Sequence, residues 1–305
     1  MAGWGGCRVL DGIAKGAAEL GHSVYYYLEQ GFLFPPPLGI VPLKAPTQDV
    51  DIMHVQDEVM LGRLSARPDI WVRTVHVDVA IRGQDRNICS GPQYIYVSKT
   101  CAAAYGSTRY VWNGIDPSEF LYSEVKDDYF LFVSGPEVAI SKGLDIAADL
   151  SNKLGFHLVV AGSCWSERFI DQVTEQCKRC GASYVGEIYG TAKAVLFANA
   201  KALLFPTKWN ESFGLVLAEA LMSGTPVISS NNGACPELIP PDVGFVCKNE
   251  DDYIYAVKHI GEISPKACRE KAMRDFHYRT MAGGYLKEYA AAISSHGAAG
   301  RASVA

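Results

Sequence analysis

Short apolar runs alternate with longer helical stretches along almost all of this 305-residue chain. The runs are rich in Val, Ile, Leu and Tyr and do not strictly alternate with polar residues, which is typical of strands covered on both faces. Predicted strands lie at residues 22–29, 50–56, 70–77, 93–98, 129–135, 157–163, 202–207 and 226–230. Helical stretches such as 143–155 and 191–202 separate them. The pattern predicts an α/β fold of doubly wound parallel sheets.

A polar, acidic stretch with one proline, residues 116–128, is the best candidate for a domain boundary. We therefore predict an N-terminal domain over 1–124 and a C-terminal domain over 125–276, in line with the length of the chain. Residues 294–305 are mostly small and are predicted to form a disordered tail. Doubly wound sheets bind ligands at the carboxyl ends of their strands, so a functional motif is expected directly after a strand.

Composition narrows the classes of partner. The net charge is -5 and no stripe of Lys and Arg stands out, which argues against nucleic acid. No apolar window is long enough to span a membrane and no secretion signal is visible, so a cytoplasmic protein is expected. Peripheral membrane contact and a homodimer stay open.

The sequence predicts no metal site. Of the nine cysteines only Cys177 and Cys180 lie close together, and no second pair follows at zinc-site spacing. This pair closes a helical stretch instead of opening one, which favours a structural role for reduced thiols. Asp49 and Asp51 resemble a metal-binding acidic pair, but they begin a strand where a ligand pair should follow one.

Two carboxylates, Glu211 and Glu219, follow the strand at 202–207. A helix is predicted to begin near Ser212 or Phe213, and the free N–H groups of its first turn suit a phosphate or a hydroxyl-rich ligand. Glu211 also fits a plain helix N-terminus, and Glu219 a solvated face. Because the helix is apolar nearly all round, however, a charge at Glu219 needs a partner or a ligand. Two acids near one strand end suit the hydroxyls of a sugar.

Lys142 and His76 also follow strands. The strand at 129–135 ends at Gly135, and Lys142 then precedes a helix, where its ammonium could neutralise a phosphate. A lone lysine in a loop is more often solvated. A histidine at a strand end is more often a structural hydrogen-bonder, although its place at the ligand-binding edge favours function.

Gly5 and Gly6 stand before a helical stretch and would form a phosphate cradle with open N–H groups. Such a cradle normally follows a first strand, but only Met1 and Ala2 precede Gly3.

Together these motifs resemble the retaining glycosyltransferases of family 4, which have the GT-B fold of two facing Rossmann-like domains. "ESFGLVLAEALMSGTPVI" is similar to the family's signature with two glutamates, and "SKGLDIA" to its Lys-Gly loop. "GWGG" is similar to its first glycine loop, "VHVD" to its strand-end histidine and "YVWNGIDPSEF" to the run that joins the domains. "NNGACPELI" is similar to its Gly-Glu segment, and the run 275–289 to its closing helices. The last of these, 277–293, would cross back onto the N-terminal domain.

The resemblance implies a role for each site residue. Glu211 would hold hydroxyls of the transferred sugar, and Glu219 the ribose of the donor. His76, Lys142 and Glu211 would be catalytic. The donor, a nucleotide-diphosphate sugar that acts as co-substrate without a further cofactor, would be held by Gly5, Gly6, Gly135, Lys142, Gly186, Ile188, Glu211, Ser212, Phe213, Gly214, Leu215 and Glu219.

Two departures from the family pattern affect these roles. The family usually has an arginine shortly before the Lys-Gly loop, where this chain has Pro136 and Glu137. Arg8 or Lys208 would have to replace that cation. The N-terminal domain, which in this family binds the acceptor, is also short and has no recognisable first strand.

The resemblance implies a retaining, metal-independent transfer of a hexose-like sugar to a hydroxyl of a small-molecule, glycan or lipid-linked acceptor. One alternative is a catalytically weak sugar-nucleotide-binding subunit that needs a partner, which the missing arginine favours. Another is a sugar-nucleotide epimerase of the same fold, although no acid/base pair for that reaction is evident. The base, the sugar and the acceptor are not determined by the sequence.

Overall fold

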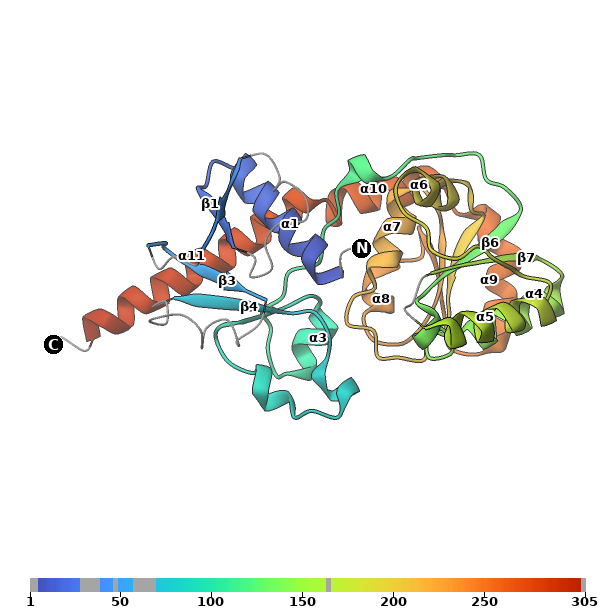
Figure 1. Cartoon of the computed structure of the whole chain (residues 1–305), viewed down its shortest axis with the longest axis horizontal. Helices are drawn as coiled ribbons and strands as arrows, with labels where there is room; N and C mark the ends of the chain where they lie inside the picture. The colour runs from blue at the N-terminus through green and yellow to red at the C-terminus, as the bar shows by residue number, and fades with distance from the viewer. Residues whose placement is uncertain (1–4, 28–38, 46–48, 57–69, 163–165, 303–305) are drawn as a thin grey trace. The chain divides into compact units, whose positions relative to one another are not determined.

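The protein consists of two compact units of α/β structure, each with parallel strands (Figure 1). The computed structural model describes residues 5–27, 39–45, 49–56, 70–162 and 166–302. Unit 1 comprises residues 1–115 and 275–305, and unit 2 comprises residues 116–274. All strand pairs among the described residues are parallel, which confirms the predicted fold class.

Unit 1 has two small sheets. Its helices are α1 (Gly5–Glu19), α3 (Lys99–Ala104) and α11 (Tyr278–Ala302), with 3-10 turns η1 (Val79–Arg82) and η2 (Arg86–Cys89). Its strands are β1 (Val24–Tyr27), β2 (Ile40–Leu43), β3 (Met53–Val55), β4 (Trp71–Val75) and β5 (Tyr94–Tyr96). Within the described ranges, β1 pairs with β2, and β4 lies between β3 and β5.

The long helix α11 lies along α1 (Figure 1). Glycines make this approach close. A Cβ on Gly16 would lie 2.4 Å from the Cβ of Ala282, and one on Gly12 would lie 3.0 Å from the Cε of Met281. Side chains larger than hydrogen at these positions would push the two helices apart.

A buried polar chain ties α11 to the strands of unit 1. His54 on β3 hydrogen-bonds to the hydroxyls of Tyr289 (2.6 Å) and Thr74 (2.9 Å). Thr74 on β4 also bonds to the hydroxyl of Tyr285 at 2.8 Å. Because each polar group has a partner, the network can lie in the interior at little cost.

Unit 2 is a doubly wound domain built on one six-stranded sheet. Its strands are β6 (Tyr129–Val133), β7 (His157–Ala161), β8 (Ser183–Tyr184), β9 (Ala202–Phe205), β10 (Val227–Ser230) and β11 (Gly244–Cys247), in the spatial order β11-β10-β9-β6-β7-β8. The helices are α4 (Leu144–Leu154), α5 (Glu167–Arg179), α6 (Gly190–Asn199), α7 (Leu215–Met222), α8 (Cys235–Leu238), α9 (Glu250–His259) and α10 (Pro265–Asp275, whose last residue belongs to unit 1), with turns η3 (Pro117–Glu119), η4 (Pro136–Val138) and η5 (Ile260–Glu262).

Helices cover both faces of this sheet, which explains why its strands are apolar throughout. Residues of α4, α5 and α9 pack into one core with the strands, and α6 packs with α7. Helix α4 illustrates how the local sequence determines the buried face and the end of a helix. Leu144, Ala147 and Leu150 form its buried stripe, and Gly155 (φ 72°) ends it by donating its N–H to the carbonyl of Ser151.

Each of the predicted strands contains an observed one, but β2, β8 and β11 were missed. Strand β2 includes Pro42, β8 has only two residues, and β11 begins at Gly244, so none has a strong strand signal. Unit 2 begins at Asp116, at the start of the polar stretch proposed as the boundary. Helix α11 continues to Ala302, where the sequence predicted a disordered tail from residue 294. Residues 294–302 include three alanines, the strongest helix formers, beside two glycines and two serines.

Candidate active site

The candidate site centres on Lys142 and Glu211, which follow β6 and β9. These two strands are neighbours, and the chain crosses from β6 to β7 on one side but returns to β9 on the other, so the strand order reverses here. Ligands of doubly wound sheets bind at such a reversal, beyond the carboxyl ends of the strands. The Lys142 ammonium contacts the Glu211 carboxylate, and the two side chains are only 15% and 14% exposed.

The loop that carries Lys142 is fixed by backbone contacts. Gly143 has a φ of 88°, and a Cβ there would lie 2.1 Å from the carbonyl oxygen of Pro206. Beside it, the N–H of Lys208 donates to the carbonyl of Ser141 at 3.0 Å. The Lys142 ammonium also lies 4.4 Å from the centroid of the Trp209 ring, a cation–π distance. Residue 143 therefore has to be glycine for Lys142 to reach this position.

A second glycine fixes the main chain of Glu211. Gly233 has a φ of 59°, and a Cβ there would lie 2.2 Å from both the nitrogen and the oxygen of Glu211. The N–H of Ala234 donates to the Glu211 carbonyl at 2.8 Å. The loop after β10 thus packs directly on the backbone of the proposed catalytic residue.

The helix beyond Glu211 begins later than predicted. Helix α7 starts at Leu215, with Gly214 as its N-cap in the left-handed region (φ 83°), and not near Ser212 or Phe213. A glycine permits that turn without strain. Ser212 and Phe213 are buried, at 6% and 2% exposure. The positively polarised start of α7 therefore lies at 214–215, directly after Glu211.

Glu219 has the partner that its apolar helix required. The Lys193 ammonium of α6 lies 2.6 Å from a carboxylate oxygen of Glu219, whose side chain is 5% exposed. Lys193 also lies 5.6 Å from the ring centroids of Phe120 and Phe197. The predicted ribose contact of Glu219 stays a prediction, now with a lysine beside it.

Two of the residues predicted to hold the donor, Gly186 and Ile188, follow β8. Gly186 has a φ of 73°, and its carbonyl accepts the N–H of Gly162, at the end of β7, at 2.8 Å. Ile188 lies in the same loop, before α6. Gly135 follows β6, and a Cβ there would lie 2.9 Å from the carboxylate oxygens of Glu137. Where the family pattern has a cation, this chain therefore places an exposed acid.

The remaining predicted residues lie in unit 1. Gly5 and Gly6 form the first turn of α1, and His76 directly follows β4. The His76 Nε2 atom is buried and bonds to no described residue. Burial, together with the charge of Arg73, lowers the pKa of His76 to about 4, so the ring is neutral near pH 7. A neutral ring can still accept or donate a hydrogen bond to a substrate.

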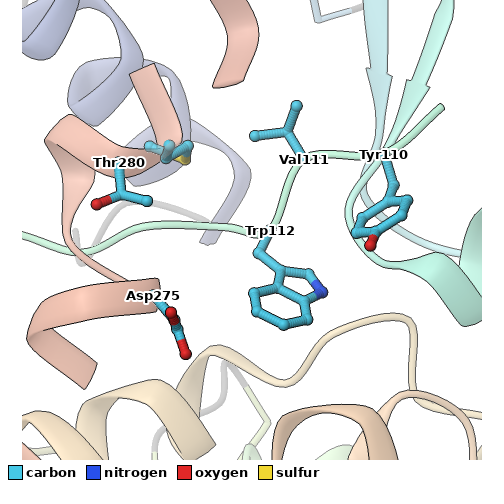
Figure 2. Close-up of a pocket in the computed structure, with 6 residues that line it drawn as sticks. Tyr110, Val111, Trp112, Asp275 and Thr280 are labelled. Atoms are coloured by element: carbon cyan, nitrogen blue, oxygen red, sulfur yellow. The ribbon is translucent and has the colours of Figure 1, made fainter. Parts of the chain in front are cut away.

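Two cavities accompany these residues. One, of about 150 Å³, lies in unit 1 and is smaller than most ligand sites, which start at roughly 300 Å³. Figure 2 shows Tyr110 and Trp112 projecting from one extended segment, with Asp275 and Thr280 coming from the helical C-terminal part. The other, of about 360 Å³, lies in unit 2 at the ends of β9, β10 and β11.

Among the described residues, no group of three or more His, Cys, Asp or Glu side chains is placed to bind a metal ion. No helix in the same residues combines the length and the apolar character needed to cross a bilayer.

Residues 123–274 match the family model of "Glycosyl transferases group 1". This segment is similar to the group 1 glycosyl transferases. It covers nearly all of unit 2, including Lys142, Glu211 and Glu219. The finer assignment to family 4 remains the resemblance stated above.

Known structures and sequences show a similar likeness. AviGT4, a glycosyltransferase involved in avilamycin A biosynthesis, superposes with a TM-score of 0.77 at 25% identity, over 96% of this chain and 91% of AviGT4. The HepE structure of Anabaena with UDP and glucose has a TM-score of 0.72 at 16% identity, over 94% and 96% of the two chains, which supports the GT-B fold alone.

Among the curated relatives, the chain is similar to the O-antigen chain mannosyltransferase RfbU of Salmonella typhimurium. The two are 25% identical over 187 residues, which cover 58% of this chain and 52% of RfbU. The chain spans between 32% and 52% of the length of the curated relatives that it matches.

Sequence reasoning missed two side chains near the site, Lys193 and Trp209. Lys193 lies in a helix of ordinary appearance, 26 residues before Glu219, and nothing local marks it as a partner. Trp209 stands two residues before Glu211. This closeness to a glutamate of the motif was the one feature of the sequence that could have indicated its place near the site.

Proposed function

We propose that this chain is a retaining glycosyltransferase that moves a hexose-like sugar from a nucleotide-diphosphate sugar to a hydroxyl acceptor. The observation that carries the proposal is the meeting of Lys142 and Glu211 at the strand-order reversal of a segment similar to the group 1 glycosyl transferases. The Lys142 ammonium, a cation for the diphosphate, is thereby held beside the Glu211 carboxylate, which can accept hydrogen bonds from sugar hydroxyls. The glycine contacts at 143 and 233 support a preorganised site.

In the proposed reaction, negative charge develops on the departing diphosphate while the sugar gains oxocarbenium character. The Lys142 ammonium and the N–H groups at 213–215 would stabilise that charge. Glu211 would hold sugar hydroxyls through charge-assisted hydrogen bonds. The acceptor hydroxyl would attack from the face that the diphosphate leaves, and a phosphate oxygen would take its proton. These groups provide the electrostatic stabilisation without a divalent metal.

His76 and Glu219 would take supporting parts. The low pKa of His76 keeps its ring neutral, so we infer a hydrogen bond to the sugar and no charge stabilisation. Glu219 would accept the ribose hydroxyls of the donor. Lys193, whose ammonium lies 2.6 Å from a Glu219 oxygen, would fix the orientation of that carboxylate.

Replacing Glu211 tests the proposal. Glu211→Ala should lower the transfer rate from a sugar nucleotide by roughly 100-fold or more, because a charged hydrogen bond made in the transition state is worth about 3 kcal/mol. Glu175→Ala, which removes an exposed carboxylate on α5, is the matched control and should keep full activity. Thermal unfolding would establish that both variants fold. Normal turnover by a folded Glu211→Ala variant would overturn the assignment.

A second candidate function, a catalytically weak sugar-nucleotide-binding subunit, is favoured by one observation. Glu137 stands beside Gly135, where the family pattern supplies an arginine for the diphosphate. Repulsion between this carboxylate and the phosphates would weaken donor binding or leaving-group stabilisation. Hydrolysis of a sugar nucleotide by the purified chain distinguishes the two, since a binding subunit would show none.

A further inference from the structure

The loop that carries His76 is fixed at its far end by a buried carboxylate. Strand β4 ends at Val75, which pairs with Tyr96 of β5, and His76 is the first residue beyond it. Val77 is 39% exposed, and Asp78 is buried again, at 3% exposure. This short loop therefore has one end fixed in the sheet and depends on Asp78 at the other.

Both carboxylate oxygens of Asp78 accept hydrogen bonds. Oδ1 accepts the Nε–H of Arg86 at 3.0 Å, and Oδ2 accepts an N–H of the same guanidinium at 2.6 Å. Oδ1 also accepts the N–H of Ala80 at 3.1 Å and the hydroxyl of Tyr105 at 3.3 Å. The hydrogen bonds from Arg86 hold the pKa of Asp78 below its usual value, so the group is ionised near pH 7. A forked contact of this kind fixes direction as well as distance.

The partners of Asp78 are themselves tied to β5. Arg86 opens η2, whose last residue, Cys89, accepts the Tyr96 hydroxyl at its carbonyl at 2.8 Å. The Tyr105 ring lies 4.8 Å from the Tyr96 ring, measured between centroids. We call Asp78, Arg86 and Tyr105 the Asp78 clamp. It joins the loop after β4 to the neighbouring strand.

The His76 ring has no comparable hydrogen bond at its Nε2 atom. That atom is buried and bonds to no residue in the described ranges. The position of the ring therefore follows from packing and from the main chain that the Asp78 clamp holds. A side chain that is ordered beforehand does not have to be ordered when the substrate binds, which lowers the barrier to reaction.

We propose that Asp78 and Arg86 are positioning residues, which hold the loop after β4 so that the His76 ring meets the transferred sugar. The inference rests on the proposed function, which gives His76 its contact with the sugar. Asp78 is also the N-cap of η1, a purely structural role for which the bond from Ala80 suffices. The fork of Arg86 and the ties to β5 go beyond that role.

Substitution of Arg86 tests the clamp without removing a group that contacts the substrate. Arg86→Gln should lower kcat/KM for transfer by about tenfold, because the His76 loop then has to be ordered during the reaction. Arg86→Lys keeps the charge and one of the two bonds, so its loss should be smaller, about threefold. Arg279→Gln is the matched control, since it removes an arginine that pairs with Glu19 at 2.6 Å in the same unit. It should keep the wild-type rate.

A double-mutant cycle separates the positioning of His76 from a structural role. His76→Ala should itself lower kcat/KM at least about tenfold, and adding Arg86→Gln to it should have no further effect. If Arg86→Gln lowers the rate by the same factor with and without His76, the clamp acts on the fold and the inference is overturned. Thermal unfolding shows whether each variant folds. Should Arg86→Gln not fold, Arg86→Lys in both backgrounds answers the same question.

An NMR titration of the His76 ring tests the clamp without turnover. The signal is identified by its loss in His76→Ala. Burial, with the charge of Arg73, lowers the pKa of His76 to about 4. Loosening of the loop in Arg86→Gln should expose the ring and raise this pKa towards 6.5, whereas Arg279→Gln should leave it unchanged. An unchanged pKa in a folded Arg86→Gln variant would overturn the inference.

Failure of the positioning role and failure of the transferase proposal give different results. The transferase proposal falls if a folded Glu211→Ala variant turns over normally, and the NMR titration of His76 then still decides whether the clamp orders the ring. Full activity of Arg86→Gln or of His76→Ala, beside an inactive Glu211→Ala variant, would overturn the positioning role alone.

Discussion

The two units hold their key elements in place by different means. In unit 2, backbones of loops at the carboxyl edge of the sheet approach one another closely, as at Gly143 and Gly233. In unit 1 the closest approach at a glycine is between two helices, where Gly16 meets Ala282. Unit 1 also relies on a buried network of histidine and tyrosine side chains. The loops of unit 2 are thus fixed by steric exclusion, whereas unit 1 depends on helix packing and on the protonation of buried groups.

The largest effect should come from the loop glycines. Gly143→Ala places a methyl group 2.1 Å from the Pro206 carbonyl, so the Lys142 loop has to move. We expect a loss of stability above roughly 3 kcal/mol and a fall in transfer rate of about 100-fold, because small displacements of catalytic groups are costly. Chemical denaturation and initial rates are the measurements.

Gly155→Ala provides the matched control. This glycine has a similar φ of 72°, but no atom lies within 4 Å of an added Cβ. It should cost only about 1 kcal/mol, the strain of a left-handed alanine, and leave the rate unchanged. If both substitutions have equal effects, Gly143 is needed only for its positive φ, and its contact with Pro206 is unimportant.

The second-largest effect should come from lowering the pH, which should reduce the stability of unit 1. Burial, with a contribution from His76, lowers the pKa of His54 to about 3, and that of His76 is about 4, against 6.5 in the unfolded chain. Between pH 6.5 and 4 the unfolded state therefore binds more protons, so unit 1 loses stability as the pH falls. At pH 5 the loss is roughly 2 kcal/mol for each histidine.

Thermal unfolding followed from pH 7.5 to 4.5 measures this loss. Hydrogen exchange would assign the transition to unit 1. His76→Asn should reduce the pH dependence by about half, because one of the two buried rings is then gone. A pH dependence confined to amides of unit 2 would contradict the difference drawn between the units.

The smallest effects should come from two helix glycines of unit 1. Alanine normally stabilises a helix by about 0.5–1 kcal/mol over glycine, and Gly283→Ala should do so because no atom lies within 4 Å of its Cβ. Gly16→Ala should instead destabilise by about 1–2 kcal/mol, since its Cβ would meet that of Ala282 at 2.4 Å. Urea denaturation of both variants provides the comparison, and a stabilised Gly16→Ala would show that α1 and α11 separate freely.

The fold class and most strands could be predicted from sequence because parallel strands covered on both faces have dense apolar runs. Short strands such as β8 and β11 lack that signal. They form because neighbouring strands of the sheet pair with them, and not because of their own residues. The α11 extension was missed because glycines and serines outnumber the alanines in residues 294–305, which leaves the segment without a clear helix signal.

The site was predictable as a set of residue types, but its pairings were not. The sequence places Lys142 and Glu211 after strands, yet their contact depends on β6 and β9 being neighbours although they lie far apart in the chain. The partner of Glu219 was required by its apolar helix, but Lys193 carries no local sign of that role. The start of α7 was placed too early because the left-handed Gly214 cannot be recognised from residue type alone.

The contact between Gly233 and the main chain of Glu211 has a consequence for engineering. A chimera that imports the segment around Glu211 from a relative, but keeps the native turn after β10, would combine two surfaces shaped for different neighbours. Exchanging both segments as one cassette should preserve the alignment of the carboxylate, and this pair of loops is therefore the smallest unit to exchange when the proposed sugar site is altered.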